Sequence, residues 1–130
     1  MISNLNGYQA YQKNKYETAS PHRLITMLYE GAIRFATRAI NQIEQNNLEE
    51  TNNAIKRFQD IIYELISCLN FNDGKEVAVG LNSLYMYVIE LSIKGNIEQS
   101  AEPLQEAIGI ITEIKASWEQ IAKEVNITNV

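Results

Sequence analysis

The sequence predicts an all-α protein: an antiparallel up-down-up-down four-helix bundle with a short N-terminal arm or helix. Apolar residues recur at helical spacing in four stretches of about twenty residues, each about 30 Å long as a helix. The connections between these stretches are short, which makes successive helices antiparallel neighbours. No stretch carries the signal of a β-strand. We expect the arm over residues 1–19, the bundle over residues 20–125 and a tail over residues 126–130.

The first helix is predicted to begin within the stretch ETASPHRL. Ser20 is a natural N-cap, and Pro21 follows at the first helical position, where its missing N–H costs nothing. Asn46 and Asn47 suit the turn after this helix. The apolar positions between these two signals are Leu24, Leu28, Phe35, Ala39 and Ile43.

Turn and cap residues also delimit the other three helices. The second begins near residue 48, where acidic residues suit a helix start, and ends before the turn at Asp73–Gly74. The third runs from about Glu76 to Lys94 and is expected to stop at a glycine cap, Gly95–Asn96. The fourth follows Ser100, a candidate N-cap. Its apolar positions are Leu104, Ile108, Ile111, Ile114, Trp118, Ile121 and Val125.

Composition and charge restrict the class of protein. The chain has 130 residues, of which 45% are hydrophobic, as in one ordinary globular domain. Its single cysteine, Cys68, permits no internal disulfide and is expected to be buried and structural. The first residues lack the pattern of a signal peptide, and no run approaches a membrane span. We therefore expect a soluble cytoplasmic protein without membrane insertion.

The formal net charge of −5 is unevenly distributed along the chain. Residues 1–46 sum to +2, whereas residues 96–130 sum to −4. Nucleic-acid binding usually shows as a dense basic patch, and the sequence has none. No nucleic-acid partner is expected.

The sequence offers little for catalysis. His22 is the only histidine, and it falls in the first turn of a predicted helix rather than on an exposed mid-helix face, as a phosphotransfer module would require. No cluster of histidines and cysteines suggests a metal site, and no glycine-rich loop suggests a bound nucleotide. We expect no enzyme activity, no metal and no cofactor.

The third helix carries more apolar residues than one bundle core requires. The stripe predicted to face the core spans about 80° and holds Val77, Leu81, Leu84, Val88 and Leu91. A second arc of about 80°, close to the opposite side, holds Val79, Met86, Ile89 and Ile93. The second helix is also broad, with apolar residues over about 140°.

Three interpretations of this surplus stay open. The neighbouring helices or the N-terminal arm could bury it permanently, since bundle helices are imperfect. It could instead be a groove for an amphipathic helix or an extended segment of a partner. It could also be a self-association interface, which would make the protein a homo-oligomeric structural or adaptor protein.

The stretch YQKNKYETASPHRLITMLYEGAIRFATRAI, residues 11–40, resembles the signature of the flagellin export chaperones of the FliS type. The shared elements are a tyrosine, an asparagine, the T-A-S-P box and a leucine-rich run that ends in L-Y-E-G. Looser likeness continues downstream and covers nearly the whole chain. The matching residues are Tyr11, Asn14, Thr18, Ala19, Ser20, Pro21, Leu24, Ile25, Met27, Leu28, Tyr29, Glu30 and Gly31.

The resemblance implies a cytoplasmic chaperone that binds the disordered C-terminal segment of flagellin, its client. Such chaperones prevent premature polymerisation and help deliver flagellin to the export gate of the flagellar type III secretion apparatus. In the family, the client wraps around the bundle, and the N-terminal segment can occupy part of the client surface. The T-A-S-P box itself is interpreted as structural, because its residues have capping chemistry.

Combining this resemblance with the surplus stripes gives a prediction of site residues. Tyr8 and Tyr11 are the candidates for a movable N-terminal cover, and a homodimer stays open as an alternative partner state. The predicted client-binding residues are Ile55, Ile62, Ile66, Val79, Met86, Ile89 and Ile93.

Overall fold

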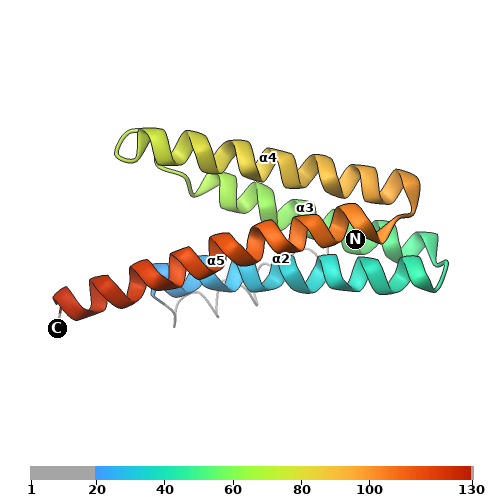
Figure 1. Ribbon diagram of the computed structural model, residues 1–130, viewed down its shortest axis with the longest axis horizontal. Coiled ribbons are helices and arrows are strands. Elements are labelled where there is room, and N and C mark those ends of the chain that lie inside the picture. Colours follow the sequence, from blue (N-terminus) through green and yellow to red (C-terminus); the bar gives the residue numbers. More distant parts are fainter. Residues whose placement is uncertain (1–19, 130) are drawn as a thin grey trace, which may run out of the picture.

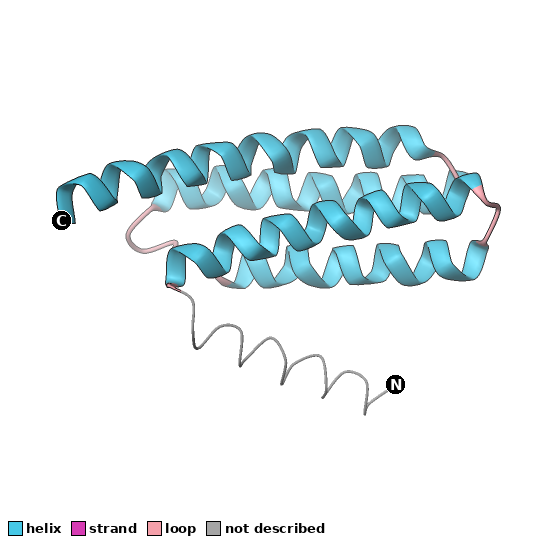
Figure 2. Cartoon of the chain, turned by 90° about the horizontal axis from the view of Figure 1, so that it is seen from below, coloured by secondary structure: helices cyan, strands magenta, loops and turns pink. Residues whose placement is uncertain are grey.

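The computed structural model describes residues 20–129, which form four helices packed side by side (Figure 1). The helices are α2 (Pro21–Glu44), α3 (Leu48–Ser67), α4 (Lys75–Glu98) and α5 (Ala101–Asn129). Each helix packs against its neighbour in the chain, and α5 returns to pack against α2. The connections lie at the two ends of the bundle (Figure 2). The predicted all-α bundle is confirmed.

Side-chain caps start the first two of these helices where the sequence predicted. The Oγ of Ser20 accepts a hydrogen bond from the backbone N–H of Arg23 at 3.1 Å, and proline occupies the first turn. The Oδ1 of Asn47 accepts from the N–H of Glu50 at 3.1 Å. Asn46 precedes it in the left-handed conformation, with φ of 58°. These bonds satisfy N–H groups that have no partner within the helix.

The predicted glycine cap of the third helix is wrong. α4 continues through Gly95, and Gln99, with φ of 49°, takes the left-handed position that ends it. Gly95 is buried, and a Cβ placed there would lie 3.0 Å from the Cγ of Leu104 and 3.2 Å from the carbonyl oxygen of Ser100. The glycine is therefore explained by the close approach of the first turn of α5, not by helix termination.

The hydrophobic core lies along the bundle axis in two clusters. The smaller cluster, near the turn between α2 and α3, is built from Ala39, Ala54, Ile55 and Leu104. The larger cluster contains Leu28, Tyr29, Ala32, Ala36, Phe58, Ile61, Ile62, Leu65, Tyr85, Val88, Ile89, Leu91, Ala107 and Ile111. All four helices contribute to it, which makes the bundle one cooperative unit.

Two buried tyrosines meet in the larger cluster. The hydroxyl oxygens of Tyr29 on α2 and Tyr85 on α4 are 2.6 Å apart and share a hydrogen bond. Burial raises the pKa of both phenols, so both stay protonated at neutral pH. The bond gives each buried hydroxyl a partner, as such groups require.

The core-facing side of α4 is rotated by about 50° from the predicted stripe, as helix geometry places the buried residues. Val77 and Leu84, both assigned to the core, are 69% and 41% exposed, whereas Ile89, assigned to the second stripe, is buried. Tyr85 and Ser92 take the core positions instead. Their hydroxyls are bonded inside the bundle, which removes the cost of burying them.

Two further features of the helices are the apolar composition of α4 and the length of α5. By length and composition alone, α4 is apolar enough to cross a membrane, a test that core helices of soluble proteins also pass. α5 continues to Asn129, past residue 125, where the sequence placed the end of the bundle. Its last turns extend beyond the other helices (Figures 1 and 2).

Candidate functional site

An apolar stripe runs along the outer side of α4. We name it the outer stripe and define it as Val79, Met86 and Ile93, which are 53%, 41% and 46% exposed. Their spacing of seven residues places them on one side of the helix, over a length of about 21 Å. Ile97, one turn further, is also exposed. An exposed serine and an exposed glutamate lie between these residues on the same side, so the stripe is an interrupted aliphatic row. Exposed aliphatic side chains grouped on one side of a helix are typical of an interaction surface.

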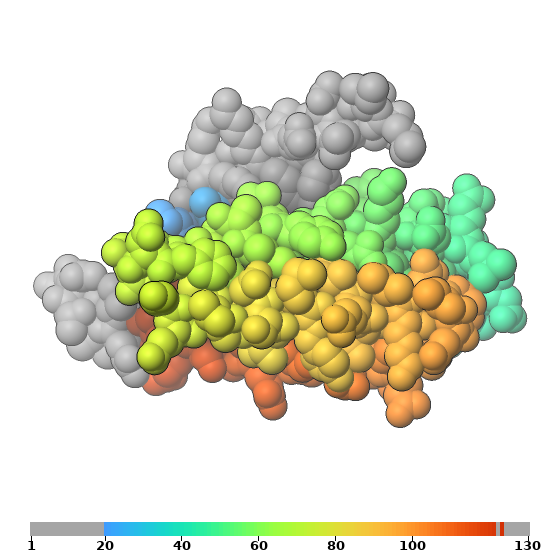
Figure 3. All heavy atoms as spheres, turned by 90° about the horizontal axis from the view of Figure 1, so that it is seen from above, coloured from blue at the N-terminus to red at the C-terminus, as the bar shows by residue number. Residues whose placement is uncertain are grey.

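Polar contacts between α3 and α4 fix how the outer stripe meets its neighbouring helix. The side-chain amide of Gln59 donates to the Oγ of Ser92 at 2.9 Å, and that of Asn96 donates to the Oδ1 of Asn52 at 3.1 Å. The two helices are therefore antiparallel with a defined register. Figure 3 shows α3, in green, and α4, in yellow to orange, side by side on one face of the molecule.

This register extends the outer stripe onto α3. Tyr63 lies four residues beyond Gln59 and is therefore level with the part of α4 near Met86. Tyr63 is exposed and Ile66 is half-buried against the core. The two residues border the outer stripe on its α3 side. The face offers an aliphatic row flanked by one aromatic side chain, a combination suited to an amphipathic segment.

The structure separates the seven predicted site residues into two groups. Val79, Met86 and Ile93 lie on the outer stripe, and Ile66 lies at its border. Ile55, Ile62 and Ile89 are buried in the core, so the prediction that they are surplus to folding is wrong. They point between helices because the apolar arcs of α3 and α4 are wide enough to reach two neighbours each. The predicted cover residues, Tyr8 and Tyr11, lie outside the described residues.

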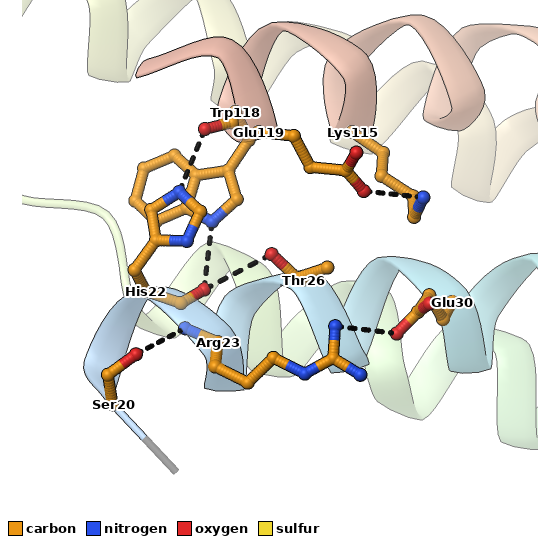
Figure 4. A network of polar contacts seen from close by, with 8 residues as sticks. All are labelled: Ser20, His22, Arg23, Thr26, Glu30, Lys115, Trp118 and Glu119. Atoms are coloured by element: carbon orange, nitrogen blue, oxygen red, sulfur yellow. Dashed lines mark hydrogen bonds and ion pairs between the residues drawn. The ribbon is translucent and has the colours of Figure 1, made fainter. Parts of the chain in front are cut away.

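The single histidine belongs to a junction between α2 and α5 (Figure 4). The Nε2 of His22 and the carbonyl oxygen of Trp118 are 2.8 Å apart, and the Nε1–H of Trp118 donates to the carbonyl oxygen of His22 at 3.0 Å. The two rings stack with centroids 4.4 Å apart. His22 lies in the first turn of α2, as predicted, and its half-buried ring is held by a hydrogen bond and by stacking.

Charged side chains surround this junction. Arg23 pairs with Glu30 along α2, and Lys115 pairs with Glu119 along α5 (Figure 4). The hydrogen bond and positive charge of Lys115 lower the pKa of the Glu119 carboxyl. Each pair lies within a single helix, and of the four residues only Arg23 is exposed rather than half-buried. The network positions the start of α2 and contains no set of groups arranged for proton transfer.

The single cysteine, Cys68, is not activated as a nucleophile by its surroundings. Cys68 is exposed at the end of α3, where the sequence predicted a buried cysteine. Partial desolvation and the Glu64 carboxylate raise the pKa of its thiol, which disfavours the thiolate. Across residues 20–129, no three histidine, cysteine or acidic side chains gather in an arrangement that could hold a metal.

Two contacts between helices could not be predicted from the sequence. Tyr29 and Tyr85 are separated by 56 residues, and His22 and Trp118 by 96. No spacing rule connects residues so far apart. The only signal was residue type, since buried tyrosine and tryptophan usually need a polar partner.

Comparison with known proteins identifies the family. A model of the family described as "Flagellar protein FliS" matches residues 4–125. A flagellar secretion chaperone FliS of Campylobacter jejuni is 36% identical over 93% of this chain and 94% of the relative. Proteins of the same name from Vibrio cholerae and Bacillus subtilis are 33% and 34% identical, over 89% and 88% of this chain and 88% and 85% of the relatives. The predicted resemblance is therefore confirmed, and the chain belongs to the FliS family of flagellar secretion chaperones.

Proposed function

We propose that this protein is a cytoplasmic export chaperone that binds the disordered C-terminal segment of flagellin along the outer stripe. It holds flagellin in a form that cannot polymerise and presents it to the flagellar type III secretion apparatus. Membership of a chaperone family supports the role, and no catalytic family is indicated. The exposed outer stripe is the single structural observation that supports this choice of surface.

The physical requirements of such a client support the outer stripe as its site. A disordered segment loses conformational entropy when it binds, so it needs a large apolar contact area to be held. Each Å² of apolar surface removed from water contributes about 25 cal/mol before the costs of association. Val79, Met86 and Ile93, with Tyr63 beside them, offer such area without unfolding the bundle. The adaptable thioether of Met86 suits a partner that folds as it binds.

Calorimetric titration with the flagellin C-terminal segment from the same organism tests the proposal. We expect one-to-one binding with a negative heat-capacity change, because apolar surface is buried. Met86→Glu should weaken binding at least tenfold while the far-ultraviolet circular dichroism stays that of the wild type. Leu84→Glu is the matched control, because Leu84 and Met86 are both 41% exposed but lie on different sides of α4. Equal loss in both variants would contradict the outer stripe as the site.

Absence of binding by the full chain requires one further step. Deletion of residues 1–16 tests whether the N-terminal arm covers the client surface. Binding by the shortened chain, but not by the full chain, would support the proposed cover. If the deletion also fails to bind, sedimentation across a range of concentrations tests the self-association alternative. An oligomer that persists on dilution and dissociates in Met86→Glu would assign the outer stripe to a second copy of the chain.

A further inference from the structure

Two glycines in the middle of helices are unexplained by the packing of the described bundle. A Cβ placed on Gly80 of α4 or on Gly109 of α5 would meet nothing within 4 Å. Both residues are exposed. Glycine is less favourable inside a helix than any residue except proline, because it loses more backbone freedom on folding. Gly95, by contrast, is explained by the close approach of Leu104.

The two glycines lie on the same face of the molecule. The hydroxyl of Tyr87 on α4 donates to the Oε2 of Glu106 on α5, which sets the antiparallel register of these helices. Gly80 lies two turns before Tyr87, on the same side of α4, and Gly109 lies within one turn of Glu106. We name this surface the glycine face.

Apolar side chains border the glycine face on α4. Val77 and Leu84 lie within one turn of Gly80, and both are exposed. On a helical wheel, Gly80 lies about 120° from Met86, so the glycine face and the outer stripe are different sides of α4.

The α5 side of the glycine face is acidic. Glu106 and Glu113 are two turns apart on one side of α5. At the α4–α5 turn, a shallow hollow is lined by Leu91, Lys94, Glu98, Ser100, Glu102, Pro103 and Glu106. Among residues 20–129, none of the four glutamates Glu98, Glu102, Glu106 and Glu113 takes part in a salt bridge. This part of the surface therefore carries four carboxylates and one lysine, Lys94. The excess of negative charge favours a cationic partner.

We propose that the glycine face docks a basic amphipathic helix of a protein other than flagellin. The backbone of that helix approaches closest at Gly80 and Gly109, where this chain presents no side chain. Its lysine or arginine side chains reach the acidic hollow, roughly seven to fourteen residues along the partner helix from that contact. A second copy of this chain fits less well, because a symmetric pair would bring two acidic faces together.

The test uses the full chain and two synthetic helical peptides of equal length. Both peptides carry an alanine and leucine stripe; one has three lysines at one end, and the other has glutamates in their place. Fluorescence anisotropy should show that the lysine peptide binds at least tenfold more tightly than the glutamate peptide. The double variant Gly80→Gln/Gly109→Gln should bind the lysine peptide at least tenfold more weakly. It should also melt at a higher temperature than the wild type, because glutamine favours the helix.

Further variants test whether the acidic residues contribute to binding and whether the glycine face acts independently of the outer stripe. Glu98→Gln/Glu102→Gln should reduce lysine-peptide binding by three- to tenfold, and Met86→Glu on the outer stripe should not change it. The glycine variant should bind the flagellin segment as the wild type does, so this inference and the proposed function can fail separately. Equal binding of both peptides, or unchanged lysine-peptide binding in the glycine variant, would overturn the inference. So would loss of flagellin binding in that variant, or loss of a dimer that the wild type forms.

Discussion

The inner and outer sides of α4 differ less in hydropathy than a simple amphipathic pattern predicts. The inner side, which packs in the core, includes a tyrosine, a serine and a glycine. The outer side presents Val79, Met86, Ile93 and Ile97 to solvent. The inner side also holds Ala78, Val88, Ile89 and Leu91, so both sides of α4 carry aliphatic residues. A helix with an aliphatic row on its exposed side as well as on its buried side is under a constraint other than its own folding.

The inner side tolerates polar groups because each one has a partner. Tyr85 bonds to Tyr29, and the Oγ of Ser92 receives Gln59 and donates to the carbonyl oxygen of Ile89. A satisfied hydroxyl costs little to bury, whereas an unsatisfied one costs about 1–3 kcal/mol. Burial on α4 is thus decided by available partners as much as by hydropathy.

The largest expected effect comes from placing the same charge on the two sides. Ile89→Glu puts a carboxylate in the core and should destabilise the fold by more than about 4 kcal/mol, enough to unfold much of the population. Met86→Glu, three residues away, should change the free energy of unfolding by no more than about 0.5 kcal/mol. Urea denaturation followed by circular dichroism measures both, and similar losses would remove the distinction between the two sides.

The next effect concerns the polar group at the centre of the inner side. Tyr85→Phe leaves the hydroxyl of Tyr29 buried without its partner and should cost about 1–3 kcal/mol of unfolding free energy. The double variant Tyr29→Phe/Tyr85→Phe should recover part of that loss, because no orphan remains. A double-mutant cycle from urea denaturation gives the coupling. Strictly additive losses would mean that the bond contributes nothing.

A smaller effect is expected at the junction between α2 and α5. His22→Ala removes a stacked ring and one hydrogen bond, and should cost about 1–2 kcal/mol. Trp118→Phe keeps an aromatic ring but loses the donor, and should cost about 1 kcal/mol. Hydrogen exchange should show faster opening at the start of α2 in both variants. Unchanged exchange there would contradict a positioning role for the junction.

The smallest effect belongs to the partly exposed pair of Lys115 and Glu119 on α5. The pKa of Glu119 is lowered in the folded state, so its contribution to stability is complete above the ordinary value of 4.5 and is lost as the pH falls through the lowered one. The difference in stability between the wild type and Glu119→Gln should therefore be small at pH 7 and vanish at low pH. Glu113→Gln, which removes a carboxylate of the same helix that has no salt bridge among the described residues, is the control variant.

Local signals in the sequence were sufficient for most of the fold. Ser20 with Pro21 predicted the start of α2, and the acidic residues after the turn at Asn46 and Asn47 predicted the start of α3, because these signals come from residues close in the chain. Gly95 was misassigned because its reason, the approach of Leu104, lies in another helix. The inner side of α4 was missed for the same reason, since the partner of Tyr85 is 56 residues away.

The candidate site was predicted less completely than the fold. Periodicity showed that α3 and α4 carry two apolar stripes, but not which stripe meets which neighbour. Val79, Met86 and Ile93 lie outside the core, whereas Ile55, Ile62 and Ile89 lie within it. The rotation of each helix about its own axis decides this, and packing against all the neighbours sets that rotation.

The bond between His22 and Trp118 has a consequence for how the protein is made. It joins residues 96 apart. At ordinary translation rates, Trp118 is therefore added to the chain about 5–20 s after His22. Until then, the side of α2 that packs on α5 is uncovered while the ribosome is still translating the chain. The start of α2 is fixed in the bundle only after the last helix has emerged. The bundle can therefore close only after residue 118 has been translated.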